Sequence, residues 1–84
     1  MPIISQFYGI SIRMYFLQSE HNPPHIHAIY GDYAAAISIK DKLILSGNLP
    51  EKAYKMVCEW ISLYEKELHE IWKSQVFTRL PPLE

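Results

Sequence analysis

The sequence has a single cysteine, Cys58, among its 84 residues. One cysteine excludes an intramolecular disulfide and a cysteine-rich zinc site, because both need several thiols. A lone thiol is typical of proteins from a reducing compartment, which favours a cytoplasmic location. The simplest interpretation of Cys58 is a small apolar residue in a helix.

The sequence also lacks an excess of charge of one sign, with 8 basic and 9 acidic residues and a net charge of −1. No global basic field is available to hold nucleic acid, so such binding would need a local patch or a partner. No apolar run approaches the ~18 residues of a membrane span, and MPIISQFYGI lacks the basic start of a signal peptide. We therefore expect a cytoplasmic protein that does not contact membranes.

The 84 residues, 49% of them hydrophobic, are enough for one domain, which we place at residues 1–84. Apolar and other residues alternate over residues 10–17, as in a half-buried strand, and residues 3–7 form a weaker strand. The runs HIHAIY and YAAAISI flank Gly31-Asp32, a two-residue hairpin signal that sets Tyr30 opposite Tyr33 and His25 opposite Ser38. LILSG predicts a short final strand.

The spacing of the apolar residues changes after residue 49, from the period of two of a strand to the period of about 3.6 of a helix. Pro50 suits the first position of a helix, and Asn48 is a plausible cap just before it. The prediction is α+β: an antiparallel sheet of four to five strands over residues 3–46, with one long or kinked helix over about 50–74 packed on one face. Such a helix would be ~37 Å long if straight, so it either bends near residues 64–67 or projects towards a partner. The apolar residues of the helix face recur at helical spacing: Ala53, Val57, Trp60, Tyr64, Leu68, Ile71 and Trp72.

The opposite face of the predicted sheet carries imidazoles. His25 and His27 are two residues apart on one strand, so they project from the same side, roughly 7 Å apart. Small residues lie across the hairpin, at Ala34 and Ala36, and would leave a shallow shelf. The candidate site gathers the polar residues of this face, with Arg13, His25 and His27 as candidate catalytic residues and Tyr15, Ser38 and the loop residue His21 as candidate ligand-binding residues.

Three interpretations of this face remain open. The first is a metal site formed by His21, His25 and His27, or by the histidine pair with Asp32. The second is metal-independent cleavage of RNA, in which the two histidines act as base and acid and Arg13 stabilises the phosphate. The third is structural, with histidines that only form hydrogen bonds or lie in an interface. No cofactor is expected.

Three segments, IISQFYGISIRMYF, EHNPPHIHAIYGDYAAAI and GNLPEKAYKMVCEWISLYEKELHEIW, resemble the bacterial domain-of-unknown-function family 4160. The most specific part of the resemblance is the run from Asn22 to Gly31, and Ile26 stands where the family often has Phe. The resemblance implies a small bacterial protein without a settled activity, often encoded beside a second small protein. It also implies that Arg13, His25, His27 and Gly31 are central.

The expected function is a binding module of a two-protein operon, toxin–antitoxin-like or regulatory, that acts through a small partner protein encoded nearby and with nucleic acid as a further ligand. A metal-independent ribonuclease of toxin type and a structural homodimer without a ligand are the alternatives. We also expect self-association through the helix end, because Ile71, Trp72, Val76 and Phe77 would form an exposed apolar patch.

Overall fold

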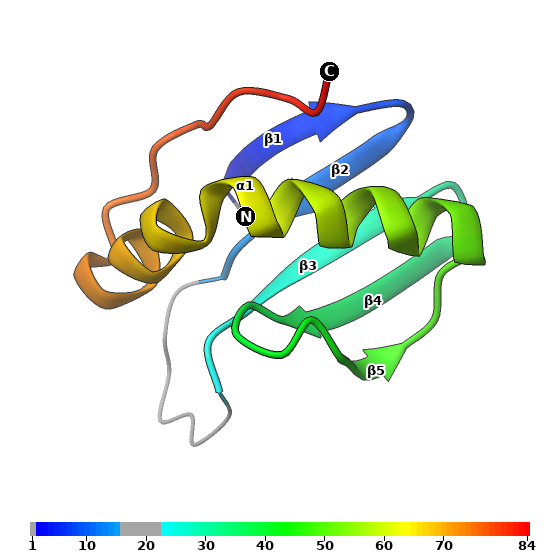
Figure 1. Ribbon diagram of the computed structural model, residues 1–84, viewed down its shortest axis with the longest axis horizontal. Helices are drawn as coiled ribbons and strands as arrows, with labels where there is room; N and C mark the ends of the chain where they lie inside the picture. Colours follow the sequence, from blue (N-terminus) through cyan, green and yellow to red (C-terminus); the bar gives the residue numbers. More distant parts are fainter. Residues whose placement is uncertain (1, 16–22) are drawn as a thin grey trace.

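The computed structural model describes residues 2–15 and 23–84. Within them, the strands of one antiparallel sheet follow the chain in the order β1-β2-β3-β4-β5, and one helix, α1, crosses a face of that sheet (Figure 1). The predicted α+β class is confirmed. The elements are β1 (Ile3–Phe7), β2 (Ile10–Arg13), β3 (His25–Tyr30), β4 (Tyr33–Ser38), β5 (Ile44–Gly47) and α1 (Glu51–Ser74).

The β3–β4 hairpin has the predicted register, with Tyr30 opposite Tyr33 and His25 opposite Ser38. Its turn contains Gly31 with a φ of 58°, a conformation that glycine adopts without steric cost. The strand predicted over residues 10–17 is shorter, since β2 ends at Arg13, and positions 16 and 17 lie outside the described residues.

The core lies between α1 and the face of the sheet that carries the isoleucines. Ile12, Met14 and Ile37 are fully buried there, as are Val57, Trp60 and Leu68, which belong to the predicted apolar face of the helix. Tyr64 of the same predicted face is only partly buried, and Ile61 is fully buried although the predicted face omitted it.

The helix bends at Tyr64, whose φ and ψ of −122° and 23° are not helical. A straight helix of 24 residues would be about 36 Å long, and the longest dimension of the molecule is 30 Å. Of the two alternatives, a bend or a projecting end, the structure has the bend. No helix among the described residues is long and apolar enough to cross a membrane.

The segment after the helix returns over the domain. Gln75 adopts a left-handed conformation and its N–H donates to Ile71 O, which ends the helix. The chain then runs beside β1, where Leu80 N–H donates to Ile4 O at 2.8 Å (Figure 1). Trp60 Nε1–H donates to Pro81 O, also at 2.8 Å.

The expected exposed apolar patch at the helix end is therefore wrong in its main part. Ile71 is only 6% exposed, and Trp72 and Phe77 pack against the core. Val76 alone of the four is largely exposed, at 66%. Ile71 is buried, whereas Trp72 and Phe77 are only partly buried, so this end exposes less apolar surface than the sequence predicts, and self-association through the helix end stays a prediction.

Candidate functional site

His25 and His27 project from the face of β3 that is opposite to the buried side chains of Ile26 and Ala28. Arg13 of β2 pairs with His27, and Ser38 of β4 pairs with His25. Antiparallel partners share a face of the sheet. The register therefore brings together the residues that the sequence assigned to one face.

Four rings form a continuous row at this end of the sheet. The ring centroids of Tyr15 and His27 are 4.2 Å apart, those of His27 and His25 are 5.0 Å apart, and those of His25 and Trp72 are 5.0 Å apart. Adjacent rings meet at angles between 55° and 80°, within the tilted and edge-to-face geometries that aromatic pairs prefer. We call Tyr15, His27, His25 and Trp72 the ring row.

Trp72 is the member of the ring row that sequence reasoning missed. It was assigned to the apolar side of the helix, and the histidines were expected on a face free of the helix. That expectation is wrong at His25, because the part of α1 beyond the bend at Tyr64 brings Trp72 into contact with it. The helix length predicted either a bend near residues 64–67 or a projecting end, and no local pattern indicates where the last turns lie after a bend.

Polar contacts orient the Arg13 and His25 side chains. Arg13 Nε–H donates to Ser11 Oγ at 3.1 Å, which leaves the two terminal nitrogens of the guanidinium for other acceptors. His25 Nδ1 lies 2.9 Å from Pro23 O. A carbonyl oxygen only accepts, so Nδ1 carries a proton, and Nε2 of the neutral ring is an acceptor. The exposed edge of the site thus offers a cation and a basic nitrogen.

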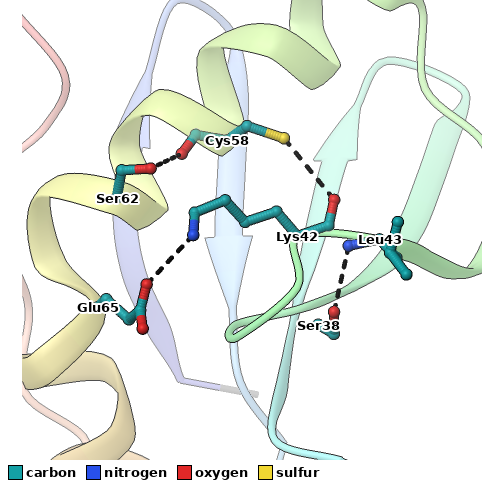
Figure 2. Close-up of polar contacts among 6 residues, drawn as sticks. All are labelled: Ser38, Lys42, Leu43, Cys58, Ser62 and Glu65. Atoms are coloured by element: carbon teal, nitrogen blue, oxygen red, sulfur yellow. Dashed lines mark hydrogen bonds and ion pairs between the residues drawn. The ribbon is translucent and has the colours of Figure 1, made fainter.

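Ser38 has a structural role in the turn after β4. Its side chain is buried, and its Oγ accepts from Leu43 N–H at 3.1 Å (Figure 2). Ala36 is also buried, whereas Ala34 is exposed. The predicted shallow shelf of small residues is therefore wrong at Ala36 and Ser38. Ser38 serves the fold by satisfying a backbone N–H of the turn.

The same turn is tied to the helix through Lys42, which adopts a φ of 58°. Lys42 Nζ pairs with Glu65 Oε1 at 3.1 Å, and Cys58 Sγ lies 3.9 Å from Lys42 O (Figure 2). Tyr54 Oη–H donates to that same carbonyl oxygen. Cys58 is half-buried in α1, and its thiol contributes to the contacts between this turn and the helix. We call Lys42, Tyr54, Cys58 and Glu65 the turn–helix contact.

Because Tyr54 belongs to the turn–helix contact, we expect the free energy of unfolding to depend on pH in the alkaline range. A hydrogen bond with Cys58, then burial, and then the charge of Cys58 raise the pKa of Tyr54. A pKa raised in the folded state adds stability that is complete below the unfolded value of about 10 and is lost as pH rises through the folded value.

Tyr54→Phe should lower the free energy of unfolding by about 1 kcal/mol at pH 7, and the difference from wild type should shrink above pH ~10. Urea melts of wild type and variant at neutral and alkaline pH measure the loss of stability and its decrease with pH. If the difference between the two proteins is the same at both pH values, the raised pKa of Tyr54 does not contribute to stability.

The described residues contain no group of three His, Cys, Asp or Glu side chains that could hold a metal ion. His21, the third ligand predicted for a histidine site, lies outside the described residues. Asp32, the alternative third ligand, is wrong: it lies in the turn beyond Tyr30, the last residue of β3, which is already roughly 10 Å along the strand from His27.

The fold and the ring row together define a small α+β protein with a polar and aromatic face at one end of its sheet. A family model described as Domain of unknown function (DUF4160) matches residues 9–73 of the 84 residues, and the chain belongs to this family. The match covers β2, β3, β4, β5 and nearly all of α1, and so it includes Arg13, both histidines and Trp72. No curated protein and no solved structure matches the chain.

Proposed function

We propose that this chain is a small bacterial binding module of the cytoplasm, one component of a two-protein operon of toxin–antitoxin or regulatory type. It acts through a small partner protein encoded nearby, and the ring row with Arg13 is the surface that contacts this partner. Nucleic acid, where it is bound, is held by the complex, because a chain with a net charge of −1 has no field of its own to attract phosphate.

The observation that carries the proposal is the composition and exposure of the ring row. Arg, Tyr and Trp are the residues that dominate binding energy at protein interfaces. Here Arg13 is half-buried and donates its Nε–H to Ser11, Tyr15 is 39% exposed and Trp72 is half-buried. A fold alone has no need to keep this much aromatic surface partly open beside a guanidinium.

The contact between the two imidazoles favours binding over acid–base chemistry. A base and an acid that act on one phosphodiester must reach the attacking and leaving oxygens on different sides of the phosphorus. His25 and His27 instead pack edge-to-face, with centroids 5.0 Å apart, and each also contacts a further ring. A phosphate group does not fit between two rings in direct contact, so both imidazoles could reach a bound phosphodiester only from the same side of its phosphorus atom.

Pairwise replacement on the ring row should separate binding from folding. We expect His25→Ala combined with His27→Ala to lower affinity for the co-expressed product of the neighbouring gene at least tenfold, the loss of a single strong interface contact. Arg13→Ala should weaken capture similarly. Lys55→Ala removes an exposed cation at the start of α1, at the opposite end of the helix from Trp72, and this variant should bind as wild type. Calorimetric titration measures affinity, and circular dichroism checks the fold.

Undiminished binding by the folded double histidine variant would exclude the ring row as the partner surface. Expression of the chain with and without its neighbour, scored by growth, then distinguishes a toxin–antitoxin pair from a regulatory one. Growth inhibition by either protein alone, relieved by the other, supports the toxin–antitoxin form.

A second candidate function is a metal-independent ribonuclease, and the pairing of Arg13 with His27 favours it. The register places the Arg13 and His27 side chains on the same face of neighbouring strands, where a guanidinium could stabilise the charge of a phosphorane. Purified protein incubated with labelled RNA tests this candidate directly. Cleavage that survives chelator and follows a bell-shaped pH profile around the histidine pKa, near 6–7, would support it. Absence of cleavage at every pH would exclude it.

A further inference from the structure

A cleft lies at the other end of the sheet from the ring row. It is a cleft of about 380 Å³ between the β1–β2 turn, the end of β3 and the first turns of α1. Tyr30 ends β3, whereas His25 begins it, so the length of the strand separates the cleft from the ring row. The residues that line the cleft are Tyr8, Tyr30, Pro50, Lys52, Ala53 and Met56.

Tyr8 occupies a backbone position that is costly for tyrosine. It has a φ of 49° and is followed by Gly9 with a φ of 79°, so both central residues of the two-residue β1–β2 turn have positive φ. Such turns prefer Asn, Asp or Gly, and the left-handed conformation costs other residues roughly 1–2 kcal/mol. The Tyr8 side chain is nevertheless 60% exposed and adds little to the core. Its position points to a role outside folding.

Tyr30 provides the second aromatic wall. A Cβ at position 9 would lie 3.4 Å from the Tyr30 ring, at ordinary contact distance, so the β1–β2 turn lies directly against that ring. Tyr30 is 37% exposed, and Met56 and Pro50 add apolar surface from the helix side. The cleft is thus an open groove between two partly exposed phenol rings.

The start of α1 gives one edge of the cleft a positive character. Pro50 occupies the cap position, and no side chain of residues 2–15 or 23–84 caps the first backbone N–H groups. The predicted Asn48 cap is wrong, and Asn48 N–H instead donates to Ala34 O. Glu51 pairs with Lys55 at 3.3 Å. Among the described residues no carboxylate pairs with Lys52, so the charge of Lys52 is available at the cleft.

We propose that this cleft binds an extended, proline-containing segment of a protein partner that carries a carboxylate next to its prolines. Proline-rich segments dock into grooves walled by aromatic rings, and their preformed conformation leaves backbone carbonyls unpaired. The two tyrosine hydroxyls can donate to such carbonyls. The carboxylate complements Lys52 and the helix start. A small molecule is less suited, because small ligands are usually buried by 70–90% and this cleft is open.

The test uses a fluorescein-labelled peptide of sequence PPLPELPP and the full-length protein. Fluorescence anisotropy should detect saturable binding that weakens about tenfold when the glutamate of the peptide is replaced by lysine and is lost when its prolines are replaced by alanine. Tyr8→Asn should weaken binding about tenfold while raising the thermal midpoint, because Asn suits the turn. Tyr15→Asn is the matched control: Tyr15 is also exposed but belongs to the ring row at the other end of the sheet, so peptide binding should not change.

Failure of wild-type protein to bind the peptide at millimolar concentration would overturn the proposal. Equal binding by the alanine-substituted peptide, or by the Tyr8→Asn variant, would overturn it as well, since either result assigns the signal to non-specific contact. This cleft and the ring row share no residue, so the His25→Ala, His27→Ala variant should bind the peptide as wild type does. Loss of partner binding and loss of peptide binding can therefore be assigned to separate surfaces.

Discussion

Trp60→Ala is expected to lower the free energy of unfolding by about 3–5 kcal/mol, the usual cost of emptying a buried aromatic site. Trp60 is fully buried, and its ring lies 5.7 Å from that of Phe7 and 5.6 Å from that of Tyr64. Its indole N–H also holds the C-terminal segment through Pro81 O. One substitution therefore opens a cavity, removes two ring contacts and releases the segment that covers β1.

Trp60→Phe separates these effects, because it keeps an aromatic ring and removes the indole donor. We expect an intermediate loss and faster exchange of the Leu80 amide, whose hydrogen bond to Ile4 O depends on the segment staying in place. Urea melts measure the first effect and amide exchange the second. A loss below about 1 kcal/mol for Trp60→Ala would show that the indole does not support the core.

The β3–β4 hairpin and its two histidines could be predicted because the signals there are local. A Gly-Asp pair between two alternating segments fixes the turn, and the turn fixes which residues face each other. His25, His27 and Arg13 then share a face without any knowledge of distant contacts. The helix limits followed from the local period, whereas the helix length left two alternatives, a bend near residues 64–67 or a projecting end, of which the structure has the bend.

The remaining features depend on contacts between distant segments. The C-terminal segment has no hydrophobic period, and its position beside β1 depends on a hydrogen bond from Leu80 to Ile4. The contact of Trp72 with His25 depends on the direction of the helix after its bend. The cleft combines a strained turn residue, Tyr8, with the helix start, and no spacing in the sequence relates the two.

Gly47→Ala is expected to lower the free energy of unfolding by at least ~3 kcal/mol, or to detach β5, because it combines backbone strain with a collision. Gly47 has a φ of 76°, and a Cβ there would lie 2.0 Å from Ala34 O. That oxygen belongs to the backbone of β4, which cannot shift without disturbing its pairing with β3. The same carbonyl accepts from Asn48 N–H at 3.1 Å, and movement away from the collision would break this bond, worth about 1 kcal/mol.

Gly31→Ala is the matched control, because Gly31 shares the positive φ but lacks the collision. Its φ is 58°, and an added Cβ would meet no atom within 4 Å. The expected loss is therefore only the conformational cost, about 1 kcal/mol. Urea melts of both variants compare the totals, and amide exchange at Asn48 reports whether β5 has separated from β4. Equal losses for the two variants, with Asn48 still protected, would show that β5 tolerates a side chain at position 47 and that close packing against Ala34 does not hold this edge of the sheet.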